Sequence, residues 1–406
     1  MLAPAPAPIQ RDLLPDMLRA WALIGIVLVN VEMFSGSKMD GYPSSALATP
    51  FDSGLHILVA GLFTLKSYSL FSLMFGAGLG YQMVAALSQG VGETGRYYRR
   101  MAGLLFLGLL HAVFFFLGDI LVIYAVLGSL LYLCRNGKAK TLIIWGLIAI
   151  VVQTLLTLTA ALSLMITDSL NDPEVQRQWQ DGLAASRKAA ITIDAVFADG
   201  GFLEVARQRL IMYPGFFPAA LAFQGVSAFG FILIGLGLHK TGILGRPNDA
   251  FWHRCRIVFL PIGLIFSFYG TWLYTEAPAR MNSQALFGMA VMMAASPFST
   301  FGYAGWLAKV CTFEHGSVLR FIARGGSATL SAYLLQSVIL SFVFLEFGLG
   351  LYGQLSAGTV ILIAFATGLF TLGFVSLWLS GFKRGPVEIV LRRWTYLRKE
   401  TPSPRS

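Results

Sequence analysis

The sequence predicts an all-α, polytopic integral membrane protein with about ten transmembrane helices and with both termini in the cytoplasm. Two observations lead to this prediction. The chain contains ten apolar stretches, each long enough to cross the ~30 Å hydrocarbon layer of a bilayer. In addition, 22 of the 30 Lys and Arg residues lie in the terminal segments or in every second gap between these stretches. The expected spans are 17–36, 54–87, 101–117, 120–134, 141–167, 210–238, 257–275, 284–308, 328–349 and 358–381.

The alternation of basic residues gives the orientation of the chain. Cytoplasmic loops of membrane proteins carry an excess of Lys and Arg, so the basic gaps and both termini are assigned to the cytoplasm. The other gaps together hold only seven basic residues. The cytoplasmic set consists of Arg11, Arg19, Arg96, Arg99, Arg100, Arg135, Lys138, Lys140, Lys240, Arg246, Arg254, Arg256, Lys309, Arg320, Arg324, Lys383, Arg384, Arg392, Arg393, Arg398, Lys399 and Arg405.

The composition excludes a soluble protein. Hydrophobic residues make up 56% of the chain and charged residues 12%, with a mean hydropathy of +0.69. The net charge of +10 does not indicate nucleic-acid binding, because the excess lies at helix ends where anionic lipid headgroups attract it. We therefore expect membrane lipids as partners and no nucleic acid.

The chain divides into five segments. We expect a cytoplasmic N-terminal tail (1–16), a membrane bundle of about five spans (17–167), a large outer loop (168–209), a second bundle of about five spans (210–381) and a basic cytoplasmic tail (382–406). The tail before the first span lacks the basic start of a cleavable signal, so the first span stays as an anchor.

Two of these segments contain helices that need not span the bilayer. In the outer loop, the run from Asn171 to Glu174 is typical of a helix start, with proline in the first turn. Two interpretations stay open for this helix: a bridge between two spans, or a lid over an outward-facing cavity. The second apolar stretch is too long for one crossing, so we expect residues 51–65 to lie along the outer surface or to re-enter.

Polar residues inside the spans are the candidates for a site, because they are costly in hydrocarbon. Arg19 and Asn30 are eleven residues apart, which places them on one helix face about 16 Å apart along the axis. Arg19 either binds a ligand near the cytoplasmic rim or extends to the headgroups. Glu32 points away from that face.

His111 and Asp119 form a second candidate group, around a tight hairpin at Gly118-Asp119. On one straight helix they would be about 12 Å apart along the axis, too far for direct pairing. They can still converge on one outer cavity. His111 is either a buried histidine satisfied by a hydrogen bond or a general base, because a neutral imidazole is the base least costly to hold in a membrane.

The remaining candidates are less specific. His56, Lys66 and Glu346 can face the same outer cavity. No metal site is expected, because no His and Cys cluster has zinc spacing. The glycines at 76, 78 and 80 indicate close helix packing.

Five segments in order resemble the YeiB-like family of bacterial inner-membrane proteins, which carry a C-terminal domain of unknown function. Each segment alone is weak evidence, but their order is specific. The segments are Asp16-Met17-Leu18-Arg19 through Val29-Asn30; Lys66 with Leu70-Phe71-Ser72-Leu73-Met74-Phe75-Gly76-Ala77-Gly78; His111 with Gly118-Asp119-Ile120-Leu121 and Tyr124-Ala125; Tyr333-Leu334-Leu335-Gln336-Ser337; and Gly385-Pro386 through Glu388 to Arg392, Thr395 and Tyr396.

This family is similar in turn to the transmembrane acyltransferase superfamily, which includes the lysosomal heparan glucosaminide N-acetyltransferase. Members carry an Arg near the cytoplasmic end of the first span and a His or Asn eleven residues later, a spacing that Arg19 and Asn30 match. In the lysosomal branch a His lies ten residues before an acid, a spacing that His56 and Lys66 match with Lys in place of the acid.

The resemblance implies a cavity across the bilayer, with acyl-coenzyme A entering from the cytoplasm and an acceptor from outside. It implies His111 as the base with Asp119 orienting it, Arg19 and Asn30 on the coenzyme, and Tyr333 and Gln336 near the cavity. Two other functions stay open: a transporter or flippase of a small solute or lipid, and a non-catalytic module that binds a lipid or a partner. A homodimer is also left open. The expected location is the bacterial inner membrane.

Overall fold

The computed structural model describes residues 12–37, 44–47, 49–88, 94–169, 173–277, 282–313 and 316–396. Every regular element within these ranges is a helix, which confirms the predicted all-α class. The basic residues Arg11, Arg398, Lys399 and Arg405 lie outside the described ranges. The first elements are α1 (Leu13–Asn30), α2 (Glu32–Ser35), η1 (Ser44–Leu47), α3 (Pro50–Phe63), α4 (Lys66–Ser88), α5 (Thr94–Phe114), α6 (Leu121–Leu133), α7 (Ala139–Ser169) and α8 (Pro173–Asp199). The later ones are α9 (Phe202–Ala220), η2 (Leu221–Gly225), α10 (Val226–Thr241), η3 (Ile243–Gly245), α11 (Ala250–Arg254), η4 (Cys255–Phe259), α12 (Leu260–Thr275), α13 (Ser283–Val310), α14 (Ser317–Gly326), α15 (Thr329–Phe344), α16 (Ala357–Gly381) and α17 (Pro386–Thr395).

Seven helical segments in the described ranges are long and apolar enough to cross a membrane, so the chain is a helical membrane protein. The count becomes eight if α14 and α15, which are bent by 79°, form one broken span. Two of the ten expected spans fall short. The helix α5 begins with three arginines, and α6 has only 13 residues. The seven segments are Leu13–Ser35, Pro50–Ala85, Ala139–Thr167, Phe202–Thr241, Ala250–Thr275, Ser283–Val310 and Ala357–Gly381.

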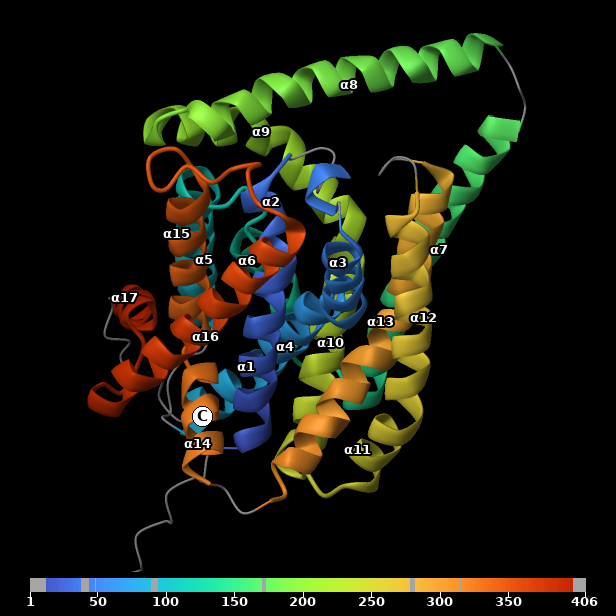
Figure 1. The fold of residues 1–406 in the computed structure, drawn as a ribbon. Helices are drawn as coiled ribbons and strands as arrows, with labels where there is room; N and C mark the ends of the chain where they lie inside the picture. Colours follow the sequence, from blue (N-terminus) through green and yellow to red (C-terminus); the bar gives the residue numbers. More distant parts are fainter. Residues whose placement is uncertain are drawn as a thin grey trace, which may run out of the picture.

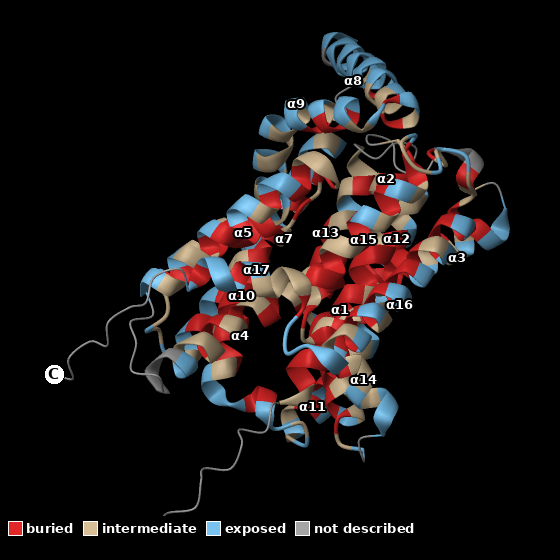
Figure 2. Cartoon of the chain, turned by 90° about the vertical axis from the view of Figure 1, so that its left-hand side faces the viewer, coloured by how far each residue is buried: buried red, intermediate tan, exposed pale blue. Residues whose placement is uncertain are grey.

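The helices form a bundle around α1. This helix packs against α3, α4, α14, α15 and α16. Figure 1 shows α8 lying across one end of the bundle and α11 and α14 at the opposite end, with α17 on the side of the bundle at about mid-height. The buried residues lie along the inward faces of the helices, whereas α8 is largely exposed (Figure 2).

The contact between α4 and α10 explains one of the predicted close-packing glycines. A Cβ atom on Gly76 would lie 1.9 Å from the Ile232 carbonyl oxygen of α10. In return, a Cβ atom on Gly235 would lie 1.8 Å from the Leu73 carbonyl oxygen of α4. The two backbones can approach this closely only because both positions lack a side chain. Gly78 differs, since nothing lies within 4 Å of its position.

The long second apolar stretch contains a break between α3 and α4. Leu65 adopts a left-handed conformation (φ 67°), which interrupts the helical hydrogen bonds. Side chains bind the carbonyl groups that the break leaves free: Lys66 Nζ donates to Gly61 O at 2.8 Å, and the Tyr303 hydroxyl to Leu62 O at 2.7 Å. Residues 50–63 form α3, which packs against α12 and α16. That this segment lies along the outer surface or re-enters stays a prediction.

The large loop forms the helix α8, which begins at Pro173 as the sequence predicts. The preceding Asn171 and Asp172 lie outside the described ranges. The C-terminal end of α8 is attached to the bundle, because Phe197 is buried and the Tyr352 hydroxyl donates to Asp194 Oδ1 at 2.7 Å. Burial, and then the hydrogen bond and charge of Asp194, raise the pKa of Tyr352. The role of α8 as a lid stays a prediction.

Candidate functional site

A cavity of about 690 Å³ enters the bundle between α1, α4, α5, α6, α15 and α17. It runs from the start of α1 to the first turn of α6. Its wall consists of Asp12, Pro15, Asp16, Arg19, Ile26, Phe71, Met74, Phe75, Gly78, Tyr81, Gln82, Ala85, Arg100, Leu104, Ile120, Leu121, Tyr124, Ser327, Thr329, Leu330, Tyr333, Arg384, Glu388 and Leu391.

The mouth of this cavity is charged. Three arginines from separate elements line it, together with three carboxylates. Arg19 Nη1 lies 3.0 Å from Asp16 Oδ1, one turn earlier on α1. Guanidinium groups can bind phosphate in a bidentate manner, so these three arginines are candidates for phosphate binding, although three carboxylates share the same opening. The charged residues are Asp12, Asp16, Arg19, Arg100, Arg384 and Glu388.

Glu388 holds one wall of the mouth in place. Its carboxylate accepts hydrogen bonds from the backbone amides of Leu330 (2.9 Å) and Ser331 (3.2 Å), and from the Ser331 hydroxyl. These amides open α15, so the acid satisfies donors that the helix leaves unpaired and complements its dipole. Glu388 thereby fixes α17 against the start of α15.

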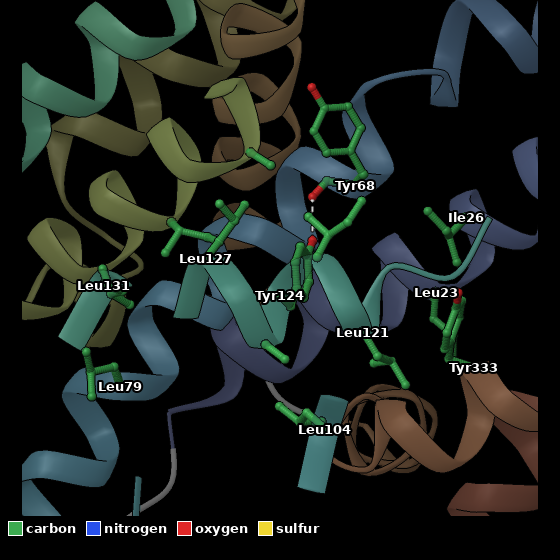
Figure 3. Packing of buried hydrophobic residues seen from close by; sticks show 14 of the residues in the cluster. Leu23, Ile26, Tyr68, Leu79, Leu104, Leu121, Tyr124, Leu127, Leu131 and Tyr333 are labelled. Atoms are coloured by element: carbon green, nitrogen blue, oxygen red, sulfur yellow. Dashed lines mark hydrogen bonds between the residues drawn. The ribbon is translucent and has the colours of Figure 1, made fainter. Parts of the chain in front are cut away.

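The inner end of the cavity is mainly apolar and aromatic. Several of its lining residues, among them Leu121, Tyr124 and Tyr333, belong to the packed core drawn in Figure 3. The Tyr124 hydroxyl donates to the Tyr68 carbonyl oxygen at 3.1 Å and lies 2.9 Å from Ser72 Oγ. Tyr333 is buried and lies on the same wall as Leu121. A chain-like apolar group would therefore meet apolar side chains here after passing the charged mouth.

The His111–Asp119 pair lies directly behind Tyr333. The ring centroids of His111 and Tyr333 are 5.1 Å apart. His111 Nδ1 lies 2.6 Å from Asp119 Oδ2, and both side chains are buried. The other carboxylate oxygen, Asp119 Oδ1, accepts the Val122 amide at 2.9 Å, so the carboxylate is fixed against the start of α6.

This direct pairing corrects the separation expected from a straight helix. The helix α5 ends at Phe114, and the amides of Phe115 and Phe116 both donate to the His111 carbonyl oxygen. The chain then reverses and returns Asp119 to the level of His111.

The pair has the arrangement of a general base. A carboxylate at Nδ1 holds the imidazole in one tautomer and leaves the Nε2 lone pair free to accept a proton. Within the described residues, His111 Nε2 is buried and has no hydrogen-bond partner. A buried nitrogen without a partner is costly, and a bound ligand that donates a hydrogen bond would remove this cost.

On the side away from the cavity, aromatic rings cover the turn after His111. Phe34 stacks on Phe116 at 4.7 Å, and Phe202 stacks on Phe114 at 5.8 Å. Arg209 is buried beside them and donates to the Phe114 carbonyl oxygen at 2.8 Å. The pair is therefore closed on this side as well as by Tyr333.

Gly108 gives the first testable prediction. A Cβ atom there would lie 2.7 Å from Asp119 Oδ1 and 2.8 Å from the Val122 amide nitrogen. We expect Gly108→Ala to destabilise the protein by about 1–3 kcal/mol and to lengthen the His111–Asp119 contact, because the start of α6 must shift. Thermal unfolding in detergent measures the first effect. Gly373→Ala is the control, because nothing lies within 4 Å of that position. Equal stability of the two variants would contradict the prediction.

Four of the other predicted residues lie on α1 or α15, and two of these four line the cavity. Arg19 and Tyr333 lie on its wall. Asn30 shares a helix with Arg19 but is not on the wall, so the structure does not support its role in binding the coenzyme. Gln336 is buried in the packing instead: its Nε2 donates to Leu23 O at 3.3 Å and to Thr371 Oγ1 at 3.2 Å.

The remaining candidates do not converge on this cavity. His56 Nδ1 lies 3.3 Å from Glu32 Oε1, in a separate pair in which His56 is buried and Glu32 is partly exposed. Lys66 is fully buried and binds Gly61 O, so it closes the break after α3. Glu346 is exposed in the turn after α15. None of these residues lines the arginine-lined cavity, and a common outer cavity for them stays a prediction.

Arg100, Arg384 and Glu388 line the cavity although no pattern in the sequence marks them as site residues. The two arginines contributed to the topology signal, and the glutamate appeared only as part of the C-terminal motif. Their convergence depends on α17 folding back between α5 and α15, a contact that no local pattern indicates.

Comparison with known proteins gives the relatives of this chain. Residues 238–398 match the family described as "Protein of unknown function (DUF418)". The uncharacterized protein YxaH of Bacillus subtilis (strain 168) is 28% identical, over 94% of this chain and 93% of YxaH. The uncharacterized protein YeiB of Escherichia coli (strain K12) is 26% identical, over 97% of this chain and 98% of YeiB. No solved structure matches. The chain is therefore similar to YeiB and YxaH over nearly its whole length and carries a DUF418 region in its C-terminal part, which confirms the YeiB-like resemblance.

Proposed function

We propose that the protein is a transmembrane acyltransferase of the bacterial inner membrane. It moves an acyl group from a cytoplasmic acyl-coenzyme A to a hydroxyl or amine acceptor on the outer side. The observation that carries this proposal is the His111–Asp119 pair. Its free Nε2 lies behind the inner wall of a cavity whose mouth is lined by three arginines.

The proposed arrangement in the membrane has ten crossings, with both termini in the cytoplasm. The helices α5 and α6 then form the third and fourth crossings. Because α6 has 13 residues, it is only about 20 Å long. The turn that carries Asp119 would therefore lie inside the ~30 Å hydrocarbon layer, between the two aqueous sides.

The residues then have distinct roles in the proposed reaction. Arg19, Arg100 and Arg384 bind the phosphates of the coenzyme, and the thioester reaches the Tyr333 wall, where the Tyr333 side chain has to move before His111 can contact the reacting groups. His111 Nε2 takes the proton of the acceptor as its oxygen or nitrogen attacks the thioester carbonyl. The new acyl bond forms, the carbon–sulfur bond breaks, and His111 returns the proton to the coenzyme thiolate. Asp119 holds Nδ1 and stabilises the imidazolium that forms in between.

Coenzyme binding tests this function. We expect Arg19→Ala and Arg100→Ala each to weaken the binding of acetyl-coenzyme A to the purified protein by about 10- to 100-fold. The reason is that a charge-assisted hydrogen bond to phosphate contributes ~1.5–3 kcal/mol. Arg19→Lys should restore only part of the affinity, because an ammonium lacks the bidentate geometry.

The matched control is Arg177→Ala. Arg177 is exposed on α8 and pairs with Glu174 at 2.6 Å, far along the chain from the cavity mouth. Its loss should leave coenzyme affinity unchanged. The acyltransferase proposal fails if the wild-type protein does not bind acetyl-coenzyme A. It also fails if Arg19→Ala and Arg100→Ala bind the coenzyme as tightly as Arg177→Ala does. A transporter would then be the better explanation.

A further inference from the structure

A second cavity lies on the other side of the bundle, away from the His111–Asp119 pair. Its volume is about 570 Å³, and residues of α7, α10, α11, η4 and α13 line it. Every lining side chain except Thr154 is apolar. The Thr154 hydroxyl donates to Ile150 O at 2.9 Å within its own helix, so it offers little to a polar ligand. The cavity therefore suits a hydrocarbon chain.

The length of this groove matches one acyl chain. On α7 it extends from Ile143 to Leu155, twelve residues, or about 18 Å along the helix axis. The lining residues recur every three or four positions, as on one helix face. One leaflet contributes about half of the ~30 Å hydrocarbon layer, so the groove reaches from one membrane surface to about the midplane.

Basic residues lie at the end of the groove where α11 is found. Lys140 precedes Ile143 by three residues on α7 and therefore lies on the same face, at the helix start. Arg254 follows the lining residue Phe251 by three residues in α11. Both side chains are exposed. The neighbouring acid Asp249 lies 3.6 Å from Arg246, so it is already next to a cation.

This charge pattern favours a lipid over a second copy of the chain. In a two-fold interface the same surface faces itself, so Lys140 and Arg254 would approach their own counterparts. Like charges across an interface oppose association, whereas an anionic headgroup complements both cations.

We propose that this groove binds one acyl chain of an anionic phospholipid, with the lipid phosphate at Lys140 and Arg254. The site is separate from the acyltransferase cavity and does not depend on that function. Each basic residue near a membrane surface contributes roughly a fivefold preference for anionic lipid, so the two together give about thirtyfold.

Native mass spectrometry of the purified protein tests this site. The protein is incubated with equal amounts of phosphatidylglycerol and phosphatidylcholine, and the retained lipid is counted. We expect the wild-type protein to retain one phosphatidylglycerol molecule in preference to phosphatidylcholine. The Lys140→Gln, Arg254→Gln double variant should lose this preference. Ala294→Trp fills the groove from an exposed position on α13 and should reduce the retention of both lipids. Leu362→Trp, at an exposed apolar position on α16, is the control and should bind as the wild type does.

Equal retention of both lipids by the wild type, or unchanged retention in Ala294→Trp, would overturn the proposal. A dimer that Ala294→Trp disrupts without changing lipid retention would assign the groove to a second copy.

Discussion

Replacement of His111 by glutamine is expected to lower acyl transfer by about 10²–10⁴-fold, the usual contribution of a general base. The amide can still donate a hydrogen bond toward Asp119, which lies 2.6 Å from the imidazole, but it has no nitrogen that accepts a proton. The folded state keeps its buried carboxylate partly satisfied, so thermal stability in detergent should fall only slightly. The measurement is transfer of radioactive label from acetyl-coenzyme A to the cell envelope, with and without the protein.

His56→Gln is the matched control, because His56 is also buried and also pairs with a carboxylate. It should retain transfer, since His56 is not on the wall of the arginine-lined cavity. Full activity without His111 and none without His56 would move the base to His56. If neither substitution has an effect on an active protein, His111 is a structural histidine.

The sequence predicts the helices well because hydrocarbon imposes a simple rule on composition and length. Each of the ten expected stretches corresponds to helix in the structure, although only seven or eight helical segments are long and apolar enough to span by that rule alone. The shortfall falls on the bent pair α14 and α15 and on α5 and α6. His111 lies on α5, and Asp119 lies in the turn between α5 and α6. Three arginines at the start of α5 and the short length of α6 keep these two helices below the length and hydropathy of an ordinary span. Such departures from the simple pattern are expected near functional sites.

The site itself was only partly predictable. The expected separation of His111 and Asp119 along a straight helix is wrong, because helical geometry says nothing about where a helix ends. The position of Lys66 depended on the left-handed conformation of Leu65, an uncommon state for a leucine that no pattern indicates. Arg384 reaches the cavity only because α17 folds back on the bundle, which is a tertiary contact rather than a local preference.

Tyr333 separates the arginine-lined cavity from the imidazole, so its removal should have two effects. We expect Tyr333→Ala to destabilise the protein by about 3–5 kcal/mol, because it removes a buried aromatic ring. It should also open the wall between the cavity and His111. Diethyl pyrocarbonate, which modifies accessible imidazoles, should then react with His111 under conditions where the wild-type residue is protected. Thermal unfolding and peptide mass spectrometry measure the two effects, and neither requires an acyl acceptor.

Tyr333→Phe is the control that separates shielding from loss of the hydroxyl. The phenylalanine ring occupies the same space 5.1 Å from the imidazole, so His111 should stay protected and stability should change little. Tyr333→Leu provides a smaller cavity if the alanine variant does not fold, and it should show intermediate exposure of His111. If His111 reacts at the same rate in the wild type, the leucine variant and the alanine variant, Tyr333 does not close the route. Substrate would then have to reach His111 from the aromatic side, past Phe116 and Arg209, where the turn after α5 is covered.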